Sequence, residues 1–330
     1  MNSSSCSTFT SKLSHNRSFL MGCAMIGIIL FHAPHNYLGV ASGLFFSIFG
    51  RWGVEIFLFL SGFGVYHSLV RNRDVKSFYK RRIIRIFPAA LVAGWMTFLV
   101  TPDNLLAILG LNLWYIQTIL IFYLFSPLFM RVMNTRNPLL FILLICLACH
   151  AFVFACYEII SPHIPFITHS SITWTLVRLP AYLMGMYVAS LGLNDTTENK
   201  KTLKSLLTTG ILSLIVAVFL RLGYDFSLYT NTCLLRSIYL FLGLSMPLVC
   251  STLYTIKSIL PSCFHIPATW MGVLSLEIYV IHELLYCFLT QELSIHPRIT
   301  ITLAILISFI FAYFFHGLSL RMQKLLLHSN

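Results

Sequence analysis

The sequence predicts an all-α membrane protein with about ten transmembrane helices and with both termini in the cytoplasm. Three observations support this prediction: 58% of the 330 residues are hydrophobic, only 10% are charged, and the mean hydropathy is +0.83. Soluble domains carry about 25% charged residues, so the composition excludes a soluble globular enzyme. The apolar segments are continuous rather than alternating with a period of two, which favours a helical bundle over a membrane barrel.

The apolar segments are long enough to form ten spans, since a spanning helix needs roughly 20 mostly apolar residues. We expect the spans at residues 19–38, 53–70, 83–101, 112–131, 139–159, 175–193, 205–222, 231–252, 268–289 and 298–318. The chain shows no internal repeat. The predicted organisation is a cytoplasmic tail over residues 1–18, one transmembrane domain over residues 19–318 and a second cytoplasmic tail over residues 319–330.

Topology explains the basic charge balance. The chain has 22 lysines and arginines against 10 acidic residues, which gives a formal net charge of +12. A basic surface is typical of nucleic-acid binding in soluble proteins. Here, with the N-terminus in the cytoplasm, 17 of the 22 cations fall on the cytoplasmic side, as the positive-inside rule requires. We therefore expect a multi-pass protein of the cytoplasmic membrane, with the lipid bilayer and not a nucleic acid as its partner.

Ionisable side chains inside the predicted spans are candidates for function, because charges in a bilayer are costly. The principal candidates are His32, Glu55, Arg85, Glu277, His282 and Glu283. His32 and Glu55 lie at similar depths in the first two spans, so their side chains can meet. Such a pair is either functional or a structural tie between two helices. His32 and His35 have a spacing that metal ligands use, but zinc needs three or four ligands and no third is found at that depth, so we expect no metal.

A basic cluster leads into the third predicted span. Its sequence from Ser77 to Pro88 is Ser-Phe-Tyr-Lys-Arg-Arg-Ile-Ile-Arg-Ile-Phe-Pro. Arg81 and Arg85 are four residues apart and share one helix face, and guanidinium groups bind phosphates through paired hydrogen bonds. The cluster predicts either a polyphosphate ligand or an anchor to anionic lipid. Arg85 lies inside the apolar run, which favours the ligand.

The nine cysteines lie mostly within the predicted spans, which argues against a disulfide framework. Cys146, Cys149 and His150 form the C-x-x-C-H pattern of covalent haem attachment. The pattern falls in the middle of an apolar span, whereas haem attachment needs an exposed segment. We therefore interpret these cysteines as small, buried packing residues.

Five segments carry motifs in a fixed order along the chain. They are Gly53–Phe63 (Gly-Val-Glu-Ile-Phe-Leu-Phe-Leu-Ser-Gly-Phe), Phe78–Pro88, Leu113–Ile116 with Ile121–Pro127, Leu179–Met186, and Leu274–His282. In this order they resemble the motifs of the acyltransferase 3 family of membrane acyltransferases. Each motif alone is weak, but five in register are specific.

The resemblance implies an enzyme that transfers an acyl group, expected to be acetyl, from cytoplasmic acyl-CoA (acetyl-CoA) to a hydroxyl of a cell-surface or lipid-linked saccharide. It implies that His32 is the general base, a role that suits imidazole because its pKa lies near working pH, and that Glu55 supports it. The implied CoA-binding residues are Tyr79, Arg81, Arg82 and Arg85. The implied substrate-binding residues are Ser61, Trp114, Tyr279 and His282.

One position departs from the family pattern. The family's first helix carries an arginine eleven residues before the histidine, and this chain has Met21 there. Arg17, fifteen residues before His32, only partly matches that position in helix geometry. Two alternatives stay open: a polytopic transporter or flippase for a glycan or lipid intermediate, which predicts inverted repeats, and a lipid-binding or assembly protein with a degenerate site.

Overall fold

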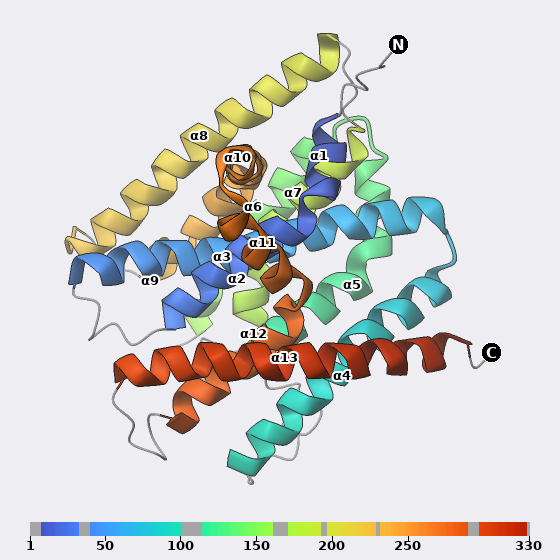
Figure 1. Cartoon of the computed structure of the whole chain (residues 1–330). Coiled ribbons are helices and arrows are strands. Elements are labelled where there is room, and N and C mark those ends of the chain that lie inside the picture. Colours follow the sequence, from blue (N-terminus) through green and yellow to red (C-terminus); the bar gives the residue numbers. More distant parts are fainter. Residues whose placement is uncertain are drawn as a thin grey trace. The chain divides into compact units, whose positions relative to one another are not determined.

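Helices make up all the regular structure in the part of the chain that the computed structural model describes, which is residues 8–32, 40–100, 114–160, 171–192, 197–228, 232–289 and 297–328 (Figure 1). Six of the helices are long and apolar enough to cross a membrane, or up to eight if each of two bent helix pairs is one span. The all-helical membrane fold is thus confirmed. Ten spans and the orientation of the termini stay predictions.

The described helices divide into two compact units, and each is described by itself. The first unit comprises Met1–Arg17, Glu55–Arg73 and Thr118–Ile259. Its helices are α1 (Phe9–His15), the second half of α3 (Val40–Arg71), most of α5 (Trp114–Met133), α6 (Pro138–Ala155) with the π-helical turn η3 (Cys156–Ile160), α7 (Ser171–Ser190), α8 (Thr197–Asp225), α9 (Thr232–Arg236) and α10 (Ile238–Ile259). Helix α10 packs against α7 and α8, and α6 packs against α7.

Two motif glycines allow α3 and α7 to approach closely within the first unit. A Cβ atom at Gly62 would collide with the carbonyl oxygen of Tyr182, and one at Gly185 would collide with that of Phe59. Small residues at such crossings let membrane helices gain contacts that the hydrophobic effect does not supply in lipid. Both glycines belong to the motif segments Gly53–Phe63 and Leu179–Met186. These motifs therefore have a packing role.

The second unit comprises Ser18–Val54, Asp74–Gln117 and Leu260–Asn330. Its helices are α2 (Arg17–His32), the first half of α3, α4 (Val75–Val100), the start of α5, α11 (Ser262–Val273), α12 (Ser275–Cys287) and α13 (Pro297–His328). Helices α4, α12 and α13 pack against one another. Helix α2 lies close to α11, where Cβ atoms at Gly22 and Gly272 would collide with the carbonyl oxygens of Ala268 and Ser18.

The span predicted at residues 268–289 is broken into two helices. Helices α11 and α12 meet at an angle of 77°, because Leu274 adopts φ −90° and ψ 8° and leaves the helical conformation. Glu277 lies in the first turn of α12, where a negative charge interacts favourably with the helix dipole. Helix α3 starts earlier than predicted, at Val40, and α13 continues to His328.

Candidate functional site

Two histidines that the sequence places 250 residues apart are hydrogen-bonded in the second unit. His32 is the last residue of α2, and its Nδ1 atom lies 2.9 Å from the carbonyl oxygen of Ile28. The same Nδ1 atom lies 3.1 Å from Nε2 of His282 on α12. The imidazole of His282 is buried, whereas that of His32 is half-buried. Both rings were predicted site residues, and the structure brings them together.

Aromatic rings extend this histidine pair. The rings of Tyr279 and His282 have centroids 5.7 Å apart, and those of Tyr115 and Tyr279 have centroids 4.8 Å apart. Trp114 adjoins Tyr115 at the start of α5, with ring centroids 6.1 Å apart. The predicted residues Trp114 and Tyr279 thus belong to the same cluster as His32. Tyr115 belongs to the motif segment Leu113–Ile116 but was not predicted as a site residue; its position next to Trp114 in the sequence was the available signal.

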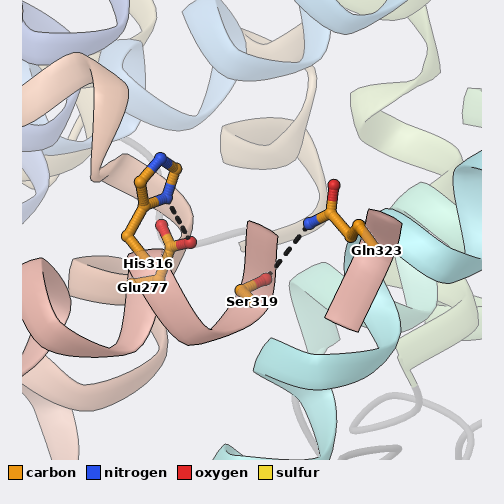
Figure 2. A network of polar contacts seen from close by, with 4 residues as sticks. All are labelled: Glu277, His316, Ser319 and Gln323. Carbon is orange, nitrogen blue, oxygen red and sulfur yellow. Dashed lines mark hydrogen bonds and ion pairs between the residues drawn. The ribbon is translucent and has the colours of Figure 1, made fainter. Parts of the chain in front are cut away.

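A second polar network in this unit joins α12 to α13 (Figure 2). The Nδ1 atom of His316 lies 2.8 Å from the buried carboxylate of Glu277. Ser319 and Gln323 lie one and two helical turns further along α13. The side-chain amide of Gln323 donates a hydrogen bond to the hydroxyl of Ser319 at 3.1 Å. The carboxylate of Glu277 is therefore bound to a histidine of the neighbouring helix.

The start of α4, which carries the basic cluster, is fixed by Asp74. Its carboxylate accepts hydrogen bonds from the backbone amides of Lys76 at 3.0 Å and Ser77 at 3.3 Å, and from the Ser77 hydroxyl. This is the arrangement of a helix N-cap. The bond from the Ser77 hydroxyl is the main reason that the pKa of Asp74 lies below its usual value. The cap fixes the first turn of α4, which precedes the arginines in the sequence.

The three arginines of α4 differ in their surroundings. The guanidinium group of Arg82 lies 5.5 Å above the ring of Phe78, which is fully buried. Arg81 is half-buried and Arg85 is exposed, and within the described part of the chain neither guanidinium forms an ion pair or a hydrogen bond. Two positive charges on one helix face are therefore available to an anion. Tyr79 is half-buried, with its ring centroid 5.4 Å from that of Phe78.

Glu55 lies in the first unit and forms a buried ion pair there. Its Oε1 atom accepts a hydrogen bond from Nη1 of Arg178 on α7 at 2.6 Å, and the two side chains are 0% and 6% exposed. The guanidinium of Arg178 also lies 4.4 Å above the ring of Tyr239. The sequence predictions missed Arg178 as a partner. A signal was present, because it is an arginine inside a predicted span beside the motif segment Leu179–Met186.

Other polar residues of the first unit tie its helices together. Ser61, a predicted substrate-binding residue, is buried and its hydroxyl lies 3.1 Å from that of Tyr123 on α5. The hydroxyl of Ser126, also on α5, lies 2.7 Å from that of Tyr182 on α7. Such bonds between helices are a common structural feature of membrane proteins. They give Ser61 a structural role, and its substrate contact stays a prediction.

The remaining sequence predictions concern residues away from these networks, and some of them fall outside the described part of the chain. His35 lies outside the described residues, as does the side chain of Glu283. The described residues contain no group of three or more metal-ligating side chains. Cys146 is buried, and its carbonyl oxygen lies 2.8 Å from Nδ1 of His150. Arg17 lies beside Gly64 of α3.

Residues 19–317 match a family model described as an acyltransferase domain, that of the acyltransferase 3 family. No curated protein and no solved structure matches the chain. The matched range includes the histidine pair, the basic cluster of α4 and the buried ion pair of Glu55 with Arg178.

Proposed function

Because the chain belongs to the acyltransferase 3 family, we propose that this membrane acyltransferase moves an acetyl group from cytoplasmic acetyl-CoA to a hydroxyl of a cell-surface or lipid-linked saccharide. The observation that carries the proposal lies in the second unit. This single unit contains both the His32–His282 pair and the arginines of α4. Helix α4 packs against α12, which carries His282.

In this proposal the arginines of α4 bind the phosphates of the donor. Arg81 and Arg85 meet no carboxylate among the described residues, so their charge is not neutralised within the described part of the protein. Several guanidinium groups suit the phosphates of CoA because each can donate two hydrogen bonds to one phosphate. Arg82, held against Phe78, adds to the positive field, and Tyr79 is a further donor-binding candidate. An anchor to anionic lipid is the competing role of this cluster.

His32 is the general base of the proposed reaction. Its imidazole takes the proton of the acceptor hydroxyl while the hydroxyl oxygen attacks the carbonyl carbon of the thioester. The carbon–sulfur bond then breaks, and the CoA thiolate leaves and takes up the proton from the imidazolium. The aromatic side chains of Trp114, Tyr115 and Tyr279 offer a surface for the acceptor or the acyl group. The support that Glu55 would give to His32 stays a prediction, since the structure pairs Glu55 with Arg178.

Mass spectrometry of surface glycans tests this function directly. Cells that carry the gene should have an acetylated glycan that cells without the gene lack. His32→Asn should lower acetylation by about 10²- to 10⁴-fold, which is the usual contribution of a general base, and should leave protein level and acetyl-CoA affinity unchanged. His150→Asn is the matched control, because His150 is also on a membrane helix and bonded to a main-chain carbonyl. Full acetylation by the His32→Asn protein would refute the role of His32 as the base, and glycans that do not differ between cells with and without the gene would refute the proposed function.

A further inference from the structure

We propose that His282 is a positioning residue that orients His32 and fixes which of its ring nitrogens is the base. This inference rests on the proposed function of His32. Sequence motifs implied only that His282 contacts a substrate. The structure instead places the His282 Nε2 atom 3.1 Å from Nδ1 of His32, which is hydrogen-bond distance for two imidazole rings.

The hydrogen bonds of His282 determine its own tautomer. Its Nδ1 atom lies 2.8 Å from the carbonyl oxygen of Tyr279 and 3.1 Å from that of Ile278. Carbonyl oxygens only accept hydrogen bonds, so Nδ1 must carry the proton. The ring is 2% exposed, and burial favours the neutral form because a buried charge is costly. A neutral imidazole has a single N–H group, so Nε2 of His282 is an acceptor.

This acceptor and a main-chain carbonyl oxygen together set the tautomer of His32. Nδ1 of His32 faces two acceptors, the Ile28 carbonyl oxygen at 2.9 Å and Nε2 of His282 at 3.1 Å. Nδ1 must therefore carry the proton, and the lone pair of His32 lies on Nε2. No described residue forms a hydrogen bond with this Nε2 atom. Nε2 is thus the atom that takes the proton of the acceptor hydroxyl.

The histidine pair also supports the charged state of the reaction. When Nε2 of His32 gains the proton, the bond from Nδ1–H to His282 becomes a charge-assisted hydrogen bond, which is stronger than a neutral one. The main-chain hydrogen bond from His32 to the Ile28 carbonyl oxygen is not particular to this site. His150 has an equivalent bond, 2.8 Å from Nδ1 to the carbonyl oxygen of Cys146. Such bonds are therefore an ordinary feature of histidines on these helices, whereas the second ring is the distinctive contact at His32.

The variants His282→Leu and His282→Gln separate positioning from mere packing. Leucine removes the acceptor, while the side-chain carbonyl of glutamine can replace Nε2 as an acceptor at similar reach. We expect His282→Leu to lower acetylation by about 10- to 100-fold, equivalent to about 1.4–2.7 kcal/mol, with unchanged affinity for acetyl-CoA. His282→Gln should recover at least part of that rate. His150→Leu is the control for replacing a membrane histidine by leucine, and it should keep the full rate.

¹⁵N NMR of the full chain in detergent, labelled at histidine, gives a readout that does not depend on activity. The resonances of His32 are those absent from the His32→Asn protein. We expect a protonated Nδ1 and an unprotonated Nε2, with the Nδ1–H signal shifted in His282→Leu and retained in His282→Gln. An unprotonated Nδ1, or a His282→Leu protein with the full acetylation rate, would overturn the inference. Equal loss of rate and of acetyl-CoA binding in both variants would also overturn it and indicate substrate binding. If the His32→Asn protein still acetylated glycans at the full rate, His32 would not be the base whatever its tautomer; if glycans of cells with and without the gene did not differ, the proposed function itself would fail.

Discussion

Replacing Glu55 with glutamine should destabilise the first unit. The carboxylate lies 2.6 Å from the guanidinium of Arg178, and the two side chains are 0% and 6% exposed. Removing one partner of a buried ion pair costs about 3–5 kcal/mol, because the other charge stays buried and unpaired. Glutamine keeps one hydrogen bond to Arg178, and the ring of Tyr239 stays beneath the guanidinium. We therefore expect the lower end of this range, about 3 kcal/mol.

Denaturant unfolding of the purified protein in detergent measures this change. The double variant Glu55→Gln with Arg178→Met should regain most of the lost stability, because replacing both members of a buried pair is often neutral. Glu277→Gln is the matched control: its carboxylate is also buried, but its partner His316 has a neutral form. We expect this control to lose about 1 kcal/mol, the contribution of one hydrogen bond.

Two results would contradict the structural role of Glu55. One is a Glu55→Gln protein with wild-type stability that has lost glycan acetylation, which would make Glu55 a catalytic residue. The other is a double variant no more stable than Glu55→Gln alone, which would mean that the two side chains are not energetically coupled. Both unfolding and acetylation should therefore be measured on the same preparations.

Three further predictions concern the donor site, the cap of α4 and the topology. Arg85→Ala should weaken acetyl-CoA binding by about 1.5–3 kcal/mol, as for a hydrogen bond to a charged group. Added salt should weaken acetyl-CoA binding more in the wild type than in the variant. Unchanged affinity of the variant in a calorimetric titration would leave only the lipid-anchor role. The carboxyl pKa of Asp74 lies below its usual value of 3.8. The charged carboxylate therefore stabilises α4 fully above pH 3.8, and this stabilisation is lost as the pH falls through the lower pKa of the folded state. The stability difference between wild type and Asp74→Asn, followed by circular dichroism, should shrink on acidification, and a difference that grew would refute this. Asn199→Cys, in a background without the native cysteines, should not react with an impermeant thiol reagent in intact cells, since the positive-inside rule puts this position in the cytoplasm.

The sequence was sufficient to predict the fold class and to identify the residues that carry local motifs. Long apolar runs predict helices because the bilayer leaves the backbone few alternatives. His32 stood out because an ionisable group inside a span is costly. The break at Leu274 was missed, since leucine is a good helix former and the apolar run continues across it.

The partners of the ionisable groups could not be predicted from the sequence, for a different reason. Glu55 was expected beside His32 because their depths along two spans agree, but depth does not determine the rotation of a helix about its axis. The structure pairs Glu55 with Arg178, 123 residues away along the chain, and His32 with His282. In the same way, the sequence identifies Gly62 and Gly185 as motif residues, but only the structure shows that they lie where α3 and α7 approach closely.

The separation of the two histidines has a consequence for biosynthesis. His282 follows His32 by 250 residues, and ribosomes add about 5–20 residues per second. Roughly 12–50 s of translation therefore pass between the synthesis of the two rings. During this interval α2 can enter the membrane, but the partner that orients its histidine does not yet exist. The growing chain thus acquires its complete histidine pair only with its last helices, after most of the protein has already been inserted.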